Sequence, residues 1–153
     1  MFCQKIVKYF LLFFVFFLTI STLPIKAEIM IEDEWARVMP SGSGSVYMKI
    51  LNNSDLGDKL VSASSDKAKM VMIHRSVRDG DIVKMIHIHD GIEIPGNSSI
   101  SLKPGDYHLM LMNIDNTFSL GDKINIKLNF EKQGVVEIFP ITKLRPPMMH
   151  KHE

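Results

Sequence analysis

The sequence predicts an all-β protein, an antiparallel sandwich or barrel of about nine short strands. Apolar and polar residues alternate over short segments, most clearly over residues 123–130, and Gly, Pro, Asn and Asp recur between these segments at near-regular spacing. No stretch shows sustained helical periodicity. Because strands this short are not stable alone, we expect two stacked sheets to bury the Ile, Val and Leu faces.

Each expected strand ends at residues typical of turns. The expected strands cover residues 35–39, 46–51, 59–63, 69–77, 82–89, 99–102, 107–114, 123–130 and 135–141, with a brief pairing at 92–94. Pro40 ends the first strand, and a Gly/Ser loop follows it. The pair Asp79-Gly80 predicts a tight hairpin between the fourth and fifth strands. Gly134 marks a similar turn before the last strand.

Residues 1–27 are predicted to be a secretory signal peptide. Lys5 and Lys8 precede an apolar run over residues 9–20, and Ala27 is the small residue at the end of a plausible cleavage site. An uncleaved membrane anchor is disfavoured because a span needs roughly 20 apolar residues. We therefore expect a soluble periplasmic protein without a membrane anchor, made of one domain over residues 28–141 and a flexible tail over residues 142–153.

Charge and cysteine content exclude several functions. Cleavage removes three of the 18 basic residues and none of the 17 acidic ones, so the net charge becomes −2 and nothing suggests nucleic acid or an anionic membrane as a partner. The only cysteine, Cys3, precedes the apolar run and does not lie where a lipid-anchor cysteine is expected. The mature chain therefore lacks a disulfide, a thiol nucleophile, a thiolate zinc site and a blue-copper centre.

Methionine and histidine concentrate in residues 70–112. This segment holds five of the 11 methionines and four of the six histidines. They occur as Met-Val-Met-Ile-His at 70–74, Met-Ile-His-Ile-His at 85–89 and His-Leu-Met-Leu-Met at 108–112. Alternate residues of a strand share a face, so each strand would present sulfur and imidazole on one face and aliphatic side chains on the other.

This combination of side chains favours a cuprous site. Thioether is a soft, neutral ligand and imidazole is borderline, whereas Mg, Ca and Mn prefer oxygen, and zinc more often takes Cys, several His or a carboxylate. The candidate ligands are His74, Met85, His108 and Met110. His108 and Met110 share a strand face, and the predicted hairpin brings His74 and Met85 near each other.

Packing offers a simpler explanation for single residues. Methionine often fills gaps in cores, so Met48, Met70, Met72 and Met112, taken one at a time, are expected in the core. His87 and His89 are compatible with a solvated edge. For the four candidate ligands together, a metal site is the favoured interpretation.

The candidate ligands also resemble the signature of the periplasmic PCu(A)C-type copper chaperones. His74, Met85 after ten intervening residues, and His108-Leu109-Met110 match its pattern. Similar segments occur at 35–37, 91–95, 102–112 and 130–132, so the resemblance covers roughly residues 34–141. One departure is the 22 residues between Met85 and His108, one more than is usual in the family, and His87 is the alternative ligand there.

The resemblance implies fold, cargo and partners. It implies a cupredoxin-like β-sandwich with a Cu(I) site of two Met and two His near the surface. It also implies delivery of copper toward the dinuclear copper centre of a haem-copper oxidase, often alongside a Sco-like chaperone of thioredoxin fold. On this basis the protein is expected to be a chaperone and not an enzyme.

The sequence leaves open the role of the tail and two alternatives to a copper chaperone. Met148, Met149, His150 and His152 suggest metal capture, with Cu(II) bound through His150 and His152, but a disordered end without a role is equally compatible. A β-sandwich adhesion or assembly module without metal would place the Met and His residues in the core and on the surface. A copper-dependent redox enzyme is the other alternative, although several Met ligands would favour Cu(I) and slow turnover.

Overall fold

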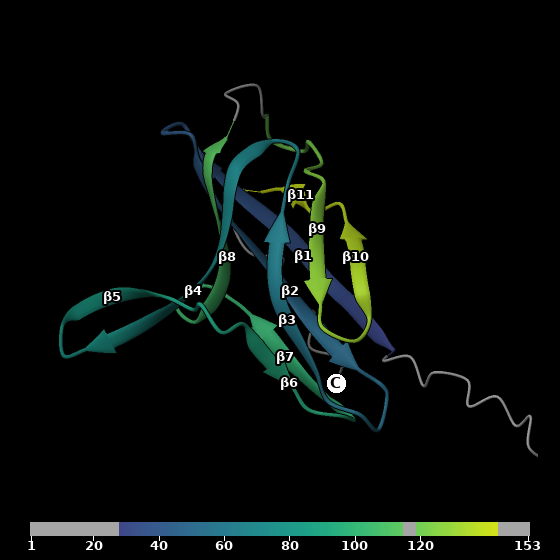
Figure 1. Cartoon of the computed structure of the whole chain (residues 1–153). Helices are drawn as coiled ribbons and strands as arrows, with labels where there is room; N and C mark the ends of the chain where they lie inside the picture. Colours follow the sequence, from purple (N-terminus) through teal and green to yellow (C-terminus); the bar gives the residue numbers. More distant parts are fainter. Residues whose placement is uncertain (1–27, 115–118, 144–153) are drawn as a thin grey trace, which may run out of the picture.

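The protein consists of two β-sheets in a computed structural model that describes residues 28–114 and 119–143 (Figure 1). The larger sheet has the order β11 (Ile141–Thr142), β1 (Ile29–Met39), β2 (Ser43–Asn52), β8 (Tyr107–Ile114), β4 (Ala68–Asp79) and β5 (Ile82–His87), and β7 (Ser98–Leu102) also pairs with β2. The smaller sheet has the order β10 (Gly134–Ile138), β9 (Ile126–Phe130), β3 (Asp58–Ser64) and β6 (Ile92–Ile94). The predicted all-β sandwich is confirmed, and neighbouring strands are antiparallel except β1 and β11.

Alternation along the strands produces the hydrophobic core. In β9 the side chains of Ile126, Leu128 and Phe130 are buried, while the residues between them are exposed. From the larger sheet, the core receives Val46 and Leu111, which are fully buried. Burying one such aliphatic side chain contributes about 1.5–3 kcal/mol, so stacking the two sheets is the main source of stability.

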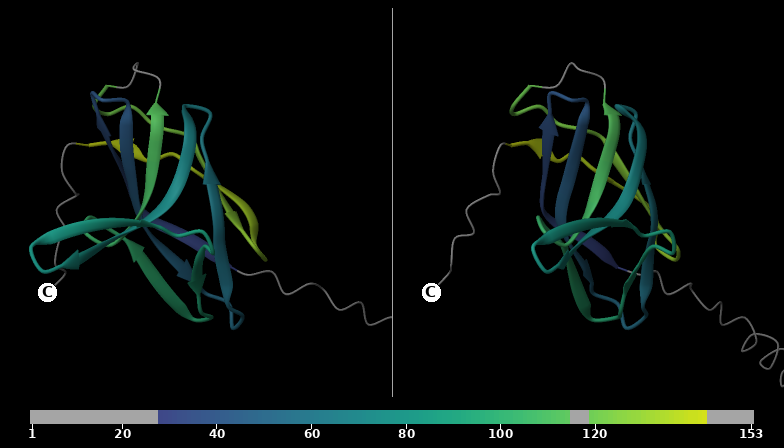
Figure 2. Two further views of the ribbon diagram at one scale, coloured as in Figure 1. Left: turned by 60° about the vertical axis from the view of Figure 1, so that its left-hand side comes forward. Right: turned by 90° about the vertical axis from the view of Figure 1, so that its left-hand side faces the viewer.

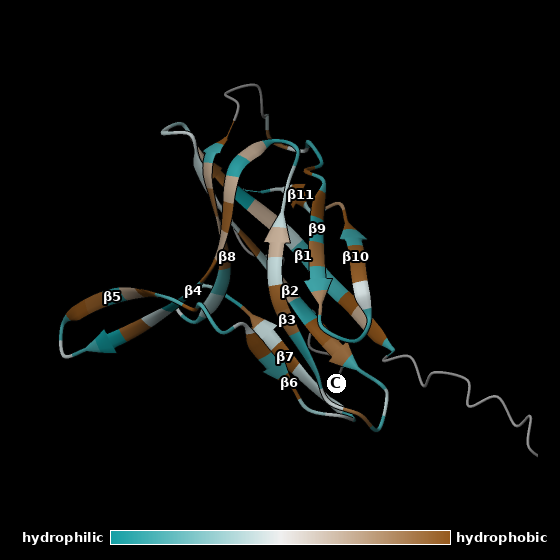
Figure 3. Ribbon diagram, in the orientation of Figure 1, coloured by the Kyte–Doolittle hydropathy of each residue, from teal (hydrophilic) through white to brown (hydrophobic). Residues whose placement is uncertain are grey.

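The β4–β5 hairpin extends away from the sandwich (Figures 1 and 2). Its strands are joined by a two-residue turn, since Asp79 pairs with Ile82 and Gly80 has a φ of 60°. This is the tight hairpin that the Asp-Gly pair predicts. Every residue of β5 is exposed although the strand is rich in apolar side chains (Figure 3). β5 is therefore an edge strand with β4 as its only neighbour in the described part of the sheet.

Strand boundaries differ from the sequence predictions, most clearly at β1 and after β10. The described residues form eleven strands rather than nine, because residues 92–94 form β6 and because the last expected strand divides into two. β1 begins at Ile29 rather than at residue 35, because a bulge between Glu32 and Trp35 lets both halves pair with β2. The strand expected over residues 135–141 divides into β10 and β11 at Pro140, which lacks a backbone N–H. β11 ends at the buried Thr142, so the sheet continues beyond residue 141.

Part of the predicted domain organisation lies outside the described residues. The signal peptide expected over residues 1–27 falls there, as do residues 144–153 of the expected tail. Within residues 28–114 and 119–143, no helix is long and apolar enough to cross a membrane.

Candidate metal site

Three strands bring three histidines into one row across the larger sheet. His74 of β4 lies directly opposite His108 of β8 and directly opposite His87 of β5. Directly opposite residues of antiparallel strands face the same side of the sheet. The ring centroids of His74 and His108 are 6.0 Å apart, and those of His74 and His87 are 5.4 Å apart. The fold therefore places three imidazoles that are far apart in sequence next to one another.

The two candidate methionines lie on opposite sides of this row of histidines, each two residues from the histidine of its own strand. Met110 follows His108 by two residues on β8 and lies opposite Met72. Met85 precedes His87 by two residues on β5 and lies opposite Ser76. Both are diagonal to His74, at a distance of about 7–8 Å between backbones, which long side chains can cover. Met85 is 61% exposed, whereas Met110 is half-buried.

Opposite faces of the same strands carry different chemistry. Ile73, Leu109 and Leu111 alternate with the candidate ligands and are buried in the core. The predicted aliphatic face behind a Met/His face is therefore confirmed for β4 and β8, but not for β5, whose residues are all exposed. We call the outward-facing side chains of Met70, Met72, His74, His108, Met110 and Met112 the Met/His face.

Met48, Met70, Met72 and Met112 are each expected in the core from the sequence, and this is correct for Met48 alone. Met48 is 3% exposed and lies in the core. Met70 is 54% exposed, and Met72 and Met112 are half-buried on the outer face. The reason is register: the pairing of β4 with β8 directs Ile73 and its alternate neighbours inward, so these methionines point outward.

His74 has the properties of an available ligand. Its Nδ1 is buried and has no hydrogen-bond partner in the part of the chain that the structure describes. Burial lowers the pKa of His74 below its ordinary value of 6.5, and the neighbouring His108 and His87 lower it further. The ring is therefore neutral at pH 7 and carries a lone pair, as metal ligation requires.

His108 is held in place by its second ring nitrogen. It is 3% exposed, and its Nδ1 donates a hydrogen bond to the backbone carbonyl of Asp106 at 2.9 Å. A carbonyl only accepts, so this bond fixes the tautomer and leaves Nε2 free to bind a metal. The arrangement is the usual support of a ligating histidine, in which one ring N–H is bound by the protein.

Sequence reasoning did not find the residues that support His108. The ring of Tyr47 lies 6.2 Å from that of His108 and stacks at 4.5 Å on Trp35. Arg75 donates to the Asp106 carboxylate at 3.2 Å. The position of Asp106, two residues before His108 in a Pro-Gly-Asp turn, is the signal that could have revealed the carbonyl contact.

The remaining histidines do not complete a site by themselves. His87 and His89 are exposed, with ring centroids 3.9 Å apart, which agrees with the solvated edge considered above. In the described part of the chain, no group of three His, Cys, Asp or Glu side chains is arranged to hold a metal ion. The candidate ligands His150 and His152 lie outside the described residues.

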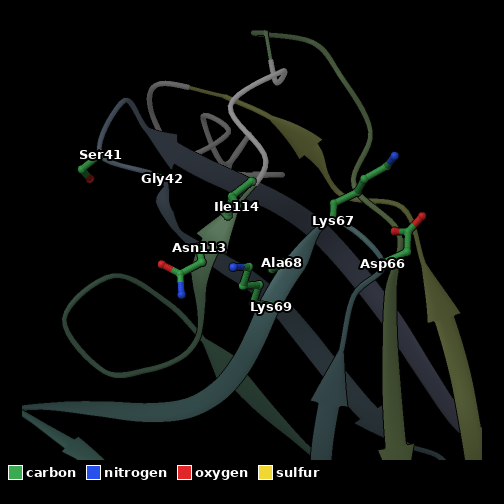
Figure 4. A pocket seen from close by; sticks show the side chains of 8 residues that line it. All are labelled: Ser41, Gly42, Asp66, Lys67, Ala68, Lys69, Asn113 and Ile114. Carbon is green, nitrogen blue, oxygen red and sulfur yellow. The ribbon is translucent and has the colours of Figure 1, made fainter.

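The pocket drawn in Figure 4 has different chemistry from the Met/His face. It lies where Ala68 of β4 pairs with Ile114 of β8, at the opposite end of these strands from His74 and His108 (Figure 4). Its lining consists of Ser41, Gly42, Asp66, Lys67, Ala68, Lys69, Asn113 and Ile114, without His or Met. The candidate metal site is thus an open sheet face and not this pocket.

Comparison with known proteins identifies the family. The sequence model of a family described as "Putative lipoprotein LpqE-like" matches residues 29–140. The chain belongs to the LpqE-like family. This LpqE-like chain is 30% identical over 114 residues to an uncharacterized protein of Rickettsia prowazekii (strain Madrid E), and 26% identical over 102 residues to a "Putative lipoprotein" of Leifsonia xyli subsp. xyli. The matches cover 71% and 67% of this chain but only 63% and 61% of the two relatives.

A solved structure confirms the expected resemblance. The LpqE-like chain is similar to a copper-bound PCuAC domain from PmoF2, with 26% identity and a TM-score of 0.64. The match covers 78% of this chain and 96% of that domain. The resemblance to the PCu(A)C family that the sequence suggests therefore holds for the fold as a whole.

Proposed function

We propose that this protein is an exported copper chaperone that carries one Cu(I) ion where its Met/His face adjoins β5. One observation supports this most: His74 and His108 lie directly opposite each other, and each has a ring nitrogen without a hydrogen-bond partner among residues 28–114 and 119–143. The similarity to a copper-bound PCuAC domain supports the choice of metal. Nothing in the proposal requires catalysis, and we propose that the protein is not an enzyme.

The proposed ligands are His74, His108, Met110 and Met85. Met110 is positioned by the same strand as His108, and Met85 extends from the exposed β5. His87 is the alternative to Met85, because it lies directly opposite His74 while Met85 is displaced by two residues. Two neutral thioethers and two neutral imidazoles suit a soft monovalent cation.

The open position of the site suits transfer of its cargo. One ligand lies on an exposed edge strand, and no ligand carries a charge that would hold the ion tightly. By family resemblance, we propose the dinuclear copper centre of a haem-copper oxidase as recipient, with a Sco-like thioredoxin-fold chaperone as a second partner. We also propose that the location is periplasmic and that the tail binds Cu(II) through His150 and His152.

The metal-free alternative receives less support from the structure. An adhesion or assembly module would have core and surface methionines without a shared place, yet Met70, Met72 and Met112 gather on one outer face beside the histidines. The buried Nδ1 atom of His74, which has no partner among the described residues, is also costly in a purely structural role.

Cu(I) titration of single variants tests the proposed function. His74→Ala, His108→Ala and Met110→Ala are expected to weaken Cu(I) binding by on the order of 100-fold or more, since loss of a supporting group alone costs 10–100-fold. Met30→Ala, an exposed methionine on β1, is the matched control and should bind normally. Comparing Met85→Ala with His87→Ala identifies the fourth ligand. Unchanged affinity in His74→Ala and His108→Ala would disprove the site.

A further inference from the structure

Three methionines on the Met/His face have no role in the proposed site. Met70 and Met112 lie directly opposite each other on β4 and β8, and Met72 lies directly opposite Met110 in the next row. Directly opposite side chains have Cβ atoms about 4.5–5.5 Å apart, and the next row is about 7 Å further along the strands. Four thioethers therefore occupy a two-by-two block beside the histidine row.

Packing does not account for this block. Met70 is 54% exposed, and the other three methionines are half-buried rather than enclosed in the core. On β9 of the smaller sheet, the outward positions are taken by Lys127 and Asn129, as is usual for a solvated face. An outward methionine gains little from burial and is open to oxidation, so four together call for another explanation.

The neighbours of the block leave it accessible. On β2, Ser43 lies opposite Met112 and Ser45 lies opposite Met110, and both serines are small. The Ser45 hydroxyl is 4.0 Å from the Met110 sulfur. Alternation ends one residue beyond Met112, where Asn113 has a φ of 51° and Ile114 turns into the core. The block thus begins at the histidine row and ends at this irregularity.

We propose that Met70, Met72 and Met112 form a second, sulfur-only site for a soft monovalent cation, with Met110 positioned between it and the histidine site. Methionine has three rotatable bonds, so sulfurs from neighbouring strands can converge on one ion above the sheet. Uncharged thioether ligands select Cu(I) or Ag(I) over harder cations and bind without losing a proton. The identification of the natural ion as copper rests on the proposed function, but the site itself does not.

Methionine methyl NMR tests the second site directly. The purified protein is labelled at the methionine methyl groups, whose signals are assigned with single Met→Leu variants, and is titrated with Ag(I) and, anaerobically, with Cu(I). The first equivalent is expected to shift Met110, and further metal is expected to shift Met70, Met72 and Met112. Met30 and Met48, one exposed and one buried, are the controls and should not move.

The titration separates failure of this site from failure of the proposed function. If Met110 does not respond to the first equivalent, the histidine site is disproved whatever the other three signals do. If Met110 responds while Met70, Met72 and Met112 stay unchanged, the second site is disproved. Movement of Met30 together with these three would show unspecific binding to any exposed thioether, which also overturns the second site.

Stoichiometry gives an independent test. In a background where Met148, Met149, His150 and His152 are replaced by Leu or Gln, competition with a colorimetric Cu(I) chelator counts the ions bound by the domain. The double variant Met70→Leu/Met112→Leu is expected to lose one equivalent and to keep the affinity of the other. Leu conserves volume, so the fold should persist, and Met30→Leu should retain both equivalents. A double variant that still binds two ions overturns the proposal.

Discussion

The two faces of β4 and β8 differ completely in role although they alternate residue by residue. Leu109 and Leu111 are fully buried between the sheets. His108 and Met110, the residues on either side of Leu109 in the sequence, belong to the Met/His face. The inner face stabilises the sandwich, and the outer face presents neutral soft ligands. The comparison shows that neighbouring residues of one strand can serve different purposes, one stabilising the fold and the next binding metal. Stability and metal binding can therefore be altered by different substitutions.

The largest expected effect comes from the inner face. Leu109→Ala leaves a cavity in a fully buried position and should lower the free energy of unfolding by about 2–5 kcal/mol. Met110→Ala removes a half-buried side chain and should cost about 1 kcal/mol or less. Urea denaturation of both variants measures the difference. An equal decrease in the free energy of unfolding for the two variants would mean that both faces contribute alike to stability.

Copper should stabilise the protein through the outer face alone. At a free Cu(I) concentration of 100 times Kd, ligation adds about 2.7 kcal/mol to the free energy of unfolding. We expect Leu109→Ala, although less stable, to gain the same increment, while His108→Ala gains none. Thermal or urea unfolding with and without Cu(I) provides the measurement. Stabilisation of His108→Ala equal to that of the parent would contradict the assignment.

Acid should weaken the fold through His74. The pKa of His74 is lowered in the native state, chiefly by burial, so the unfolded chain takes up this proton first as the pH falls. The contribution to stability is complete above about pH 6.5 and is lost progressively between 6.5 and the lowered native pKa. His74→Gln should therefore show a shallower loss of stability than the parent between about pH 7 and pH 5. Identical slopes would show that His74 is not desolvated.

The smallest effect is expected from Arg75, whose ion pair with Asp106 lies behind His108. Both side chains are substantially exposed, so Arg75→Gln should cost about 0.2–1 kcal/mol, and less in high salt. Urea unfolding at low and high salt measures this. Because the Asp106 carbonyl bond to His108 does not depend on the guanidinium, Cu(I) affinity should change little. A large loss of affinity would place Arg75 among the residues that position His108.

Much of the fold could be predicted because local sequence determines it. Alternation and turn residues give the strands, and Asp79-Gly80 gives the hairpin that carries Met85. The early start of β1 was not predictable, since residues 29–32 are strand only through pairing with β2. The same holds for β11, two residues long, whose Thr142 is buried by tertiary contacts.

The site could be predicted only as a set of residue types on shared faces. The sequence places His108 and Met110 on one face but cannot give the register between β4, β5 and β8. That register sets His87, rather than Met85, directly opposite His74. It also turns Met70, Met72 and Met112 outward, where packing statistics favour the core.

X-ray absorption at the copper edge of the one-to-one Cu(I) complex tests the central claim most directly. The account predicts a Cu(I) ion bound by both imidazole nitrogen and thioether sulfur, with the sulfur contribution reduced in Met110→Leu and the imidazole contribution reduced in His108→Ala. A spectrum without sulfur, or one that neither substitution alters, would contradict it.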